Sequence, residues 1–196
     1  AAFGVHGSAV VTSVITGGEE AANENVLLDP LEVARQIEFA AGRAGADAVK
    51  IGAVVNGEIA EAVAAKIKEL EFKTIVVDPS LALDDDADVT EGSNDAAVAY
   101  LKSALFPLDG LVVVDITECK AITGLPIKNP MGMKAAARLI RQMGPRRVVV
   151  SGSGIDSEEC TDYMFDGEEY LDLPSERIET PFTRGSGSAY SAAITA

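Results

Sequence analysis

The strongest constraint on the fold is an alternation of short runs of β-branched residues with longer segments of helical periodicity. Runs rich in Val and Ile recur along the chain, and amphipathic segments separate most of them. The predicted strands cover residues 8–16, 47–52, 74–77, 111–114 and 147–150. Continuous apolar strands of this kind are typical of a mainly parallel sheet with helices on both faces. We therefore predict a single α/β domain over residues 1–196.

Capping residues mark where the predicted helices begin and end. Asp29, Asn56 and Ser93 each stand just before a helical pattern, in the position where a side chain caps the first amides. A further helix is predicted from about Pro130 to Met143, and Gly144 follows it where a terminating glycine belongs.

Two segments depart from the alternation. Residues 17–28 are polar and irregular, and they are predicted to form a loop. Near the end of the chain, residues 163–165 and 170–173 flank an Asp-Gly pair, which is typical of a β-hairpin. The predicted strand at 8–16 is expected to be buried, like the other Val-rich strands.

Composition and charge exclude several classes of function. The net charge of -15 argues against nucleic-acid binding, which requires a basic surface. No run of about eighteen apolar residues is present, so no membrane span is expected. The two cysteines, Cys119 and Cys160, are too few for a disulfide framework, and a cytoplasmic location is expected. The single histidine, His6, argues against both a catalytic triad and a histidine metal site.

A glycine-rich turn precedes a run of small residues at the end of the chain. Gly185, Ser186, Gly187 and Ser188 stand directly before a helix-compatible segment. A Gly-x-Gly turn that opens a helix leaves backbone N–H groups unpaired, and these groups favour an anion. Ser188 stands where a group that handles a hydroxyl proton would suit phosphoryl transfer. The alternative is that the two glycines only shape the entry into a packed helix.

The predicted strands end in residues that suit ligand binding. In an open parallel sheet, ligands bind beyond the carboxyl ends of the strands. These ends carry Gly52, Asp78, Asp115 and the Ser151-Gly152 pair. For Asp78 a turn or helix cap is the alternative, and the turn at Ser151-Gly152 could equally be structural. Lys50, inside a predicted strand, is expected to form a partly buried ion pair.

Asp115 and Glu118 are the candidate metal ligands. They lie three residues apart just after a predicted strand, so both carboxylates could face a metal-bound polyphosphate. The alternative for Glu118 is an acid in the first turn of a helix, where it stabilises the helix dipole.

Several segments in a fixed order identify a resemblance that covers nearly the whole chain. They are residues 4–7, 11–16, 47–52, 76–79, 118–124, 163–166, 184–188 and 191–194. In these segments the chain resembles the hydroxymethylpyrimidine (phosphomethylpyrimidine) kinases of thiamine biosynthesis, in the ribokinase-like superfamily. The resemblance implies a three-layer αβα fold and ATP-dependent, Mg²⁺-assisted phosphorylation of a small pyrimidine alcohol or its phosphate. It also implies an anion hole at residues 185–188, metal and nucleotide contacts at Asp115 and Glu118, and a homodimer.

The resemblance is accompanied by substitutions at the expected site. A substrate-contacting glutamine of the family aligns with Ala21 of this chain. After Gly52, where the family has a methionine, this chain has Ala53. Where the family has a lysine on the glycine turn, this chain has Ser151. Where the family has its catalytic cysteine, this chain has Ser188. The family also has an asparagine at a position that Asp115 occupies in this chain.

These substitutions leave three further hypotheses open. A pyridoxal or sugar-type kinase, a catalytically silent domain that senses the pyrimidine, and a non-functional truncated copy remain alternatives. Because the family's first strand and helix have no counterpart before Ala1, and the chain stops within the last helix, we expect a fragment cut at both ends.

Overall fold

The computed structural model describes residues 3–16, 24–54, 56–81, 95–155, 159–181, 183 and 185–196. Its centre is a six-stranded sheet with the strand order β3-β4-β5-β6-β7-β8. The strands are β3 (Val49–Ile51), β4 (Ile75–Val77), β5 (Leu111–Val114), β6 (Arg147–Val150), β7 (Glu159–Phe165) and β8 (Tyr170–Glu176). The first four are parallel, and β7 and β8 are antiparallel to their neighbours. The predicted mainly parallel sheet and late hairpin are therefore confirmed.

The helices follow the predicted capping signals closely. They are α1 (Pro30–Ala44), α2 (Gly57–Glu69), α3 (Asp95–Tyr100), α4 (Ile116–Thr123), α5 (Pro130–Arg141) and α6 (Ser186–Thr195). Asp29 caps α1 by accepting a hydrogen bond from Leu31 N, and Asn56 caps α2 by accepting one from Ile59 N. The predicted cap Ser93 lies outside the described residues.

The end of α5 differs slightly from the prediction. The helix ends at Arg141, two residues before the predicted Met143. Met143 and Gly144 instead form tight turns, with hydrogen bonds to the carbonyls of Ile140 and Arg141 three residues earlier. The chain therefore leaves the helix through a narrower turn before β6 begins.

The sheet divides the molecule into three unequal layers. Alternate side chains of β4, β5 and β6 point to one face and join a large core that includes residues of α1, α2, α3, α4 and α5. Val76, Val113 and Val149 point to the other face, and we call these three valines the second-face cluster. Met164, beside Val149 on β7, and Tyr190 of α6 pack against them. Helices therefore cover both faces, as predicted, but α6 is the helix that contributes to the second-face cluster.

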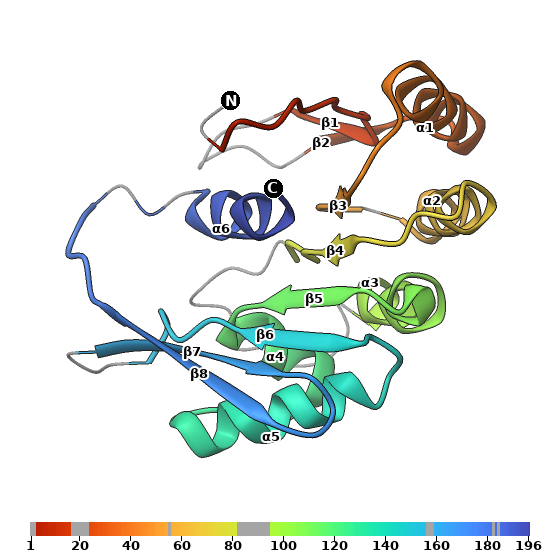
Figure 1. Ribbon diagram of the computed structural model, residues 1–196. Coiled ribbons are helices and arrows are strands. Elements are labelled where there is room, and N and C mark those ends of the chain that lie inside the picture. The colour runs from red at the N-terminus through yellow and green to blue at the C-terminus, as the bar shows by residue number, and fades with distance from the viewer. Residues whose placement is uncertain are drawn as a thin grey trace.

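The N-terminal segment corrects two predictions. The predicted buried strand at residues 8–16 is a short exposed strand, β1 (Ser13–Thr16), in which Val14 is 48% exposed. It pairs with β2 (Glu24–Leu27) in a separate antiparallel ribbon, although residues 17–28 were predicted to be a loop. β-Branched residues indicate extended structure but do not specify the partner strand, which explains the error. Figure 1 shows this ribbon apart from the main sheet, near α1.

Two irregular helical turns, Leu101–Leu105 and Phe106–Leu108, follow α3 and fill the large core beside α2. Leu101 and Leu105 are each 1% exposed, so this segment contributes fully buried side chains to the core. Within the described part of the chain, no helix is long and apolar enough to cross a bilayer.

Candidate active site

The carboxyl ends of the parallel strands and the beginning of α6 lie at the same edge of the molecule. In Figure 1 the arrowheads of β3, β4 and β5 point toward the side where α6 lies. Gly52 follows β3, Asp78 follows β4, Asp115 follows β5 and Ser151 follows β6. The fold therefore carries all four predicted strand-end positions to the edge where α6 packs, because parallel strands end on the same side.

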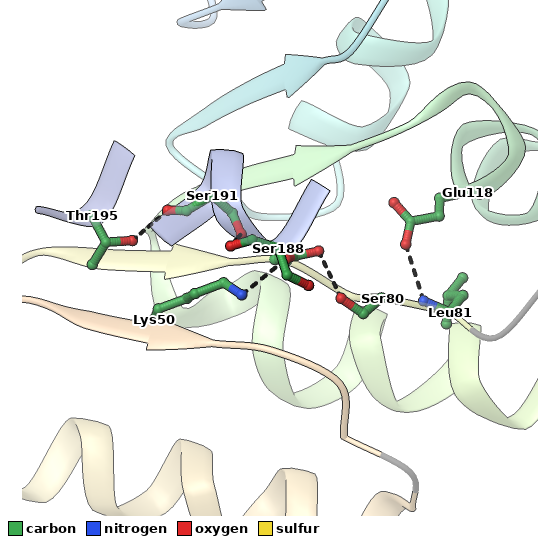
Figure 2. A network of polar contacts seen from close by, with 8 residues as sticks. Lys50, Ser80, Leu81, Glu118, Ser188, Ser191 and Thr195 are labelled. Atoms are coloured by element: carbon green, nitrogen blue, oxygen red, sulfur yellow. Dashed lines mark hydrogen bonds and ion pairs between the residues drawn. The ribbon is translucent and has the colours of Figure 1, made fainter. Parts of the chain in front are cut away.

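Asp78 is the centre of a buried polar network between this edge and α6. The residue is 7% exposed, and its Oδ2 atom lies 3.0 Å from Lys50 Nζ. Ser80 Oγ donates to Oδ1 at 2.9 Å, and Ser191 Oγ, from α6, donates to Oδ2 at 2.6 Å. Figure 2 shows the side chains of Lys50, Ser80 and Ser191, which come from three separate segments. The predicted ion pair of Lys50 is confirmed, and Asp78 is fully engaged within the protein.

The glycine turn opens α6 as predicted. Gly185 has a φ of 81°, in the left-handed region that glycine adopts without strain, and it precedes the first residue of the helix. The first hydrogen bond of α6 runs from Ala189 N to Gly185 O at 3.0 Å. The amides of Gly187 and Ser188 precede this bond, so they lack acceptors within the helix.

The surroundings of this turn are open. A Cβ atom built on Gly187 would have no atom within 4 Å, and Ser188 is exposed. Ser191 Oγ also lies 3.1 Å from the carbonyl oxygen of Ser188, so the first turn of the helix is tied to the Asp78 network. The turn can therefore present amides and one hydroxyl group to a ligand while its base is held in place.

Asp115 and Glu118 form a reciprocal capping box at the start of α4. Asp115 Oδ1 accepts from Glu118 N at 2.7 Å, and Glu118 Oε2 accepts from Asp115 N at 3.0 Å. Glu118 Oε1 also accepts from Leu81 N at 3.0 Å, which links α4 to the segment after β4. Glu118 therefore lies in the first turn of a helix, as the alternative reading of the sequence predicted, and both of its carboxylate oxygens accept backbone hydrogen bonds.

Glu118 is buried although it is ionisable. It is 6% exposed, and burial raises the pKa of its carboxyl to about 7, with smaller contributions from the negative charges of Asp115 and Asp78. Two backbone hydrogen bonds oppose this rise by favouring the ionised form. Glu118 can therefore change its charge near neutral pH.

The turn after β6 is held by β7. Gly152 N donates to Asp162 Oδ1 at 2.8 Å, so this amide is already used within the protein. A Cβ atom on Gly152 would lie 2.1 Å from the carbonyl oxygen of Thr161, which explains why glycine is required. Ser151 Oγ lies 3.2 Å from Ser153 Oγ. A phosphate contact at Ser151 stays a prediction, whereas the Gly152 amide has a structural role.

Gly52, Ala53 and Ala21 are the residues predicted to contact the phosphoryl acceptor, and the structure describes the first two. Gly52 is half-buried, and a Cβ atom there would lie 3.7 Å from Lys50 Nζ. Ala53 is exposed, and its carbonyl oxygen lies 3.4 Å from Thr12 Oγ1. Ala21 lies outside the described residues. Their contact with a substrate stays a prediction.

Sequence reasoning missed four residues that organise this edge. The sequence assigns no separate role to Ser191 or Tyr190, which lie in the small-residue helix, and it does not single out Ser80 or Asp162. Ser191 is 0% exposed and polar, which marks it as a residue with a specific partner.

The carboxylates fit a metal site only in part. Mg²⁺ prefers oxygen ligands and usually takes one or two carboxylates together with phosphate oxygens and water. Asp115 is exposed and uses Oδ1 in the capping box, so its carboxylate could still reach a metal ion. Within the described ranges, no group of three or more acidic, cysteine or histidine side chains gathers around one point. Metal binding by Asp115 and Glu118 therefore stays a prediction.

Comparison with known proteins gives a consistent result. The phosphomethylpyrimidine kinase family model matches residues 1–196. A hydroxymethylpyrimidine/phosphomethylpyrimidine kinase of Synechococcus elongatus is 31% identical over 193 residues, covering 98% of this chain and 72% of that protein. A pyridoxine kinase of Bacillus subtilis is 34% identical over 158 residues, covering 78% of this chain and 56% of that protein. A bifunctional thiamine biosynthesis protein of Geobacter sulfurreducens is 31% identical, and the chain spans 39% of its length.

Solved structures show the same fold. A pyridoxal kinase from Staphylococcus aureus in complex with AMP-PCP superimposes with a TM-score of 0.84 at 23% identity, covering 95% of this chain and 67% of that chain. A phosphomethylpyrimidine kinase from Clostridium difficile 630 superimposes with a TM-score of 0.75 at 24% identity, covering 99% of this chain and 87% of that chain. The chain spans between 35% and 75% of the length of the curated relatives compared with it.

Proposed function

Because the chain belongs to the phosphomethylpyrimidine kinase family, we propose that it transfers a phosphoryl group from ATP to the hydroxymethyl group of a pyrimidine alcohol or its phosphate. The observation that carries this proposal is the position of the Gly185–Ser188 turn. It opens α6 beside the carboxyl ends of the parallel strands, and the bond from Ser191 to Asp78 holds it there. A helix beginning in this place suits the negative charge of a phosphoryl group.

The proposed reaction is an in-line displacement at the γ-phosphorus. A bond forms between the acceptor oxygen and phosphorus while the bond to the β,γ-bridging oxygen breaks, and the acceptor hydroxyl loses its proton. The amides of Gly187 and Ser188 would stabilise the negative charge on the transferring group. Such positioning and electrostatic stabilisation account for most of the catalysis in phosphoryl transfer.

Asp115 and Glu118 are proposed to face the polyphosphate. Bound Mg²⁺ would neutralise charge on the β- and γ-phosphates. Asp115 would be the direct protein ligand because it is exposed, whereas the buried Glu118 would orient it through the capping box. Asp78 would act on the other side of the turn, through Ser191, rather than by binding the nucleotide itself.

Ser188 is proposed to contact the acceptor hydroxyl. A serine hydroxyl accepts a proton far less readily than a thiolate or a carboxylate, because its ordinary pKa lies far above neutrality. General-base catalysis contributes about 10²–10⁴-fold, so its weakening slows the reaction and leaves the electrostatic contribution intact. We therefore propose a slow kinase.

The test is ADP release from Mg²⁺-ATP in the presence of hydroxymethylpyrimidine or its monophosphate. We expect turnover with the wild type, faster turnover with Ser188→Cys, and slower turnover with Ser188→Ala. Ser175→Ala is the control, because Ser175 lies on the exposed strand β8 and its hydroxyl bonds only the neighbouring strand at Cys160 O. Binding of both ligands without turnover in any variant would replace this proposal with a sensing role.

A second acceptor class is favoured by one comparison. The Bacillus subtilis pyridoxine kinase is 34% identical to this chain, as similar as the pyrimidine kinases. The same assay with pyridoxine and pyridoxal separates the two classes. A kcat/KM higher for either than for the pyrimidine alcohols would assign the chain to vitamin B6 chemistry.

A further inference from the structure

Arg177 holds the turn after β6, residues 151–155, which we call the β6 turn. Arg177 directly follows Glu176, the last residue of β8. Its Nη1 atom donates to the carbonyl oxygen of Ser153 at 3.2 Å, and its Nη2 atom donates to that of Ile155 at 2.6 Å. Because a guanidinium group is planar and rigid, two bonds from separate nitrogens fix the orientation of the turn as well as its distance from β8.

The strand directions bring Arg177 to the edge of the proposed site. β7 is antiparallel to β6, and β8 is antiparallel to β7, so β6 and β8 run in the same direction. The end of β8 therefore lies at the edge where the parallel strands end, and Figure 1 shows it on the side of the molecule where α6 lies. From Arg177 the chain leads to Gly185, which precedes α6. Arg177 thus connects the β6 turn to the segment that carries the glycine turn.

The β6 turn lies beside the proposed metal site. Ser151 N donates to Val114 O at 2.9 Å, which places the beginning of the turn next to Asp115. Farther along the turn, a Cβ atom on Gly154 would lie 3.3 Å from Cδ1 of Ile116, the first residue of α4. The turn therefore packs against the start of α4, where Asp115 is proposed to hold the metal ion and to face the polyphosphate.

The bonds of Arg177 act on the exposed part of the β6 turn. Its base is held separately, because Gly152 N donates to Asp162 Oδ1 at 2.8 Å, whereas Ser153 and Gly154 are exposed. The carbonyl of Ser153 and the N–H of Gly154 belong to one planar trans peptide, so they point in opposite directions. The bond that draws this carbonyl toward Arg177 therefore turns the Gly154 amide away from the guanidinium. An exposed backbone amide can donate to a phosphate oxygen.

We propose that Arg177 is a positioning residue that holds the β6 turn in the orientation in which the peptide between Ser153 and Gly154 contacts the nucleotide phosphates. The inference rests on the proposed function for the identity of the nucleotide. It assigns no chemical step to Arg177. Its consequence is specific to the nucleotide, because the predicted acceptor side, at Gly52 and Ala53, follows a different strand.

The experiment compares Arg177→Met, Arg177→Lys and Arg146→Met. Loss of any cation from a chain of net charge -15 weakens its attraction for an anionic nucleotide, so the charge needs its own control. Arg146 precedes β6, at the opposite end of that strand from the turn, and its Nη2 atom lies 2.7 Å from Asp109 Oδ2. Arg146→Met therefore removes the same charge away from the site. Arg177→Lys keeps the charge but loses the planar pair of donors.

We expect Arg177→Met to raise KM for Mg²⁺-ATP about tenfold, in keeping with the loss of hydrogen bonds from a charged group. Arg177→Lys should raise it at least about threefold, because an ammonium group does not reproduce the rigid fork. The values of kcat and of KM for the acceptor should stay within about twofold, as should every constant of Arg146→Met. Full rescue by lysine, or an equal effect of Arg146→Met, would show that charge alone matters and would overturn the positioning role. Thermal denaturation checks folding, and Arg177→Lys carries the comparison if Arg177→Met does not fold.

Binding of AMP-PCP, measured by calorimetry without an acceptor, separates this inference from the proposed function. A wild type that binds AMP-PCP but phosphorylates no acceptor contradicts the proposed function, whereas about tenfold weaker binding to Arg177→Met would still support the positioning role. Hydrogen exchange at the Gly154 amide should be faster in Arg177→Met than in the wild type, with no nucleotide present. Equal AMP-PCP affinities of Arg177→Met and the wild type, or no binding by the wild type, would refute the inference.

Discussion

Ser191 donates its hydroxyl proton to Oδ2 of Asp78 at 2.6 Å, although 113 positions separate the two residues in the sequence. The bond joins the last helix of the chain to the end of β4. Ser191 is 0% exposed and Asp78 is 7% exposed, so little water competes for either group. Because α6 carries the glycine turn, the bond determines where the proposed anion-binding amides lie.

Ser191→Ala should destabilise the protein and slow the proposed reaction. The substitution removes a donor from a buried carboxylate, which costs about 1–3 kcal/mol of unfolding free energy. Urea denaturation measures this cost. The control is Ser175→Ala, which removes the hydroxyl of an exposed serine. It should change the unfolding free energy by less than about 0.5 kcal/mol. Equal unfolding free energies for the two variants would contradict the role of the Ser191 bond.

Lys50→Met should destabilise the fold more than the double variant Lys50→Met with Asp78→Asn. The single change leaves Asp78 charged and buried without its cation, whereas the double change removes both charges. Breaking a buried pair costs about 3–5 kcal/mol, and we expect roughly 2–3 kcal/mol here because the Lys50 side chain is 23% exposed. Denaturation at neutral pH checks the difference. A double variant as unstable as the single one would show that the charge of Asp78 needs no partner.

The stability contributed by Glu118 should fall as the pH rises. In the unfolded chain its carboxyl loses its proton near the ordinary value of 4.5, whereas in the folded protein its pKa is about 7. Between these values the folded state binds more protons, so raising the pH through this window lowers the unfolding free energy. The decrease should be on the order of 1–3 kcal/mol.

Glu118→Gln provides the comparison for this pH dependence, because glutamine does not titrate. Denaturant midpoints between pH 5 and pH 8 should fall in the wild type relative to this variant. Parallel curves for the two proteins would show that Glu118 titrates at an ordinary pKa in the folded state.

Gly152→Ala should be far more damaging to stability than Gly187→Ala. A methyl group at Gly152 would lie 2.1 Å from the backbone oxygen of Thr161, so β7 would have to move. We expect a loss of about 3 kcal/mol, at the upper end of overpacking costs. At Gly187 no atom lies within 4 Å of the added carbon, and alanine favours helix by up to about 1 kcal/mol. Thermal denaturation separates the two, and a stable Gly152→Ala would contradict the close approach of β7.

Local pattern in the sequence determined most of the secondary structure. The side chains of Asp29 and Asn56 cap α1 and α2 where their positions predicted, and the Val-rich runs form β4, β5 and β6. These features depend on residues within one or two turns of each other, so periodicity and capping chemistry are sufficient to predict them. The glycine turn at the start of α6 belongs to the same class.

The tertiary structure alone decided which of these segments meet. Extended propensity at residues 13–16 could not show that this strand pairs with β2 in an exposed ribbon, because propensity carries no information about the partner. The partner of Asp78 is Ser191, and the partner of Gly152 N is Asp162, through contacts set by strand order and by the packing of α6. The sequence alone determined most of the elements and the family resemblance, whereas long-range packing decided the pairing of β1 with β2 and the polar links that position the site.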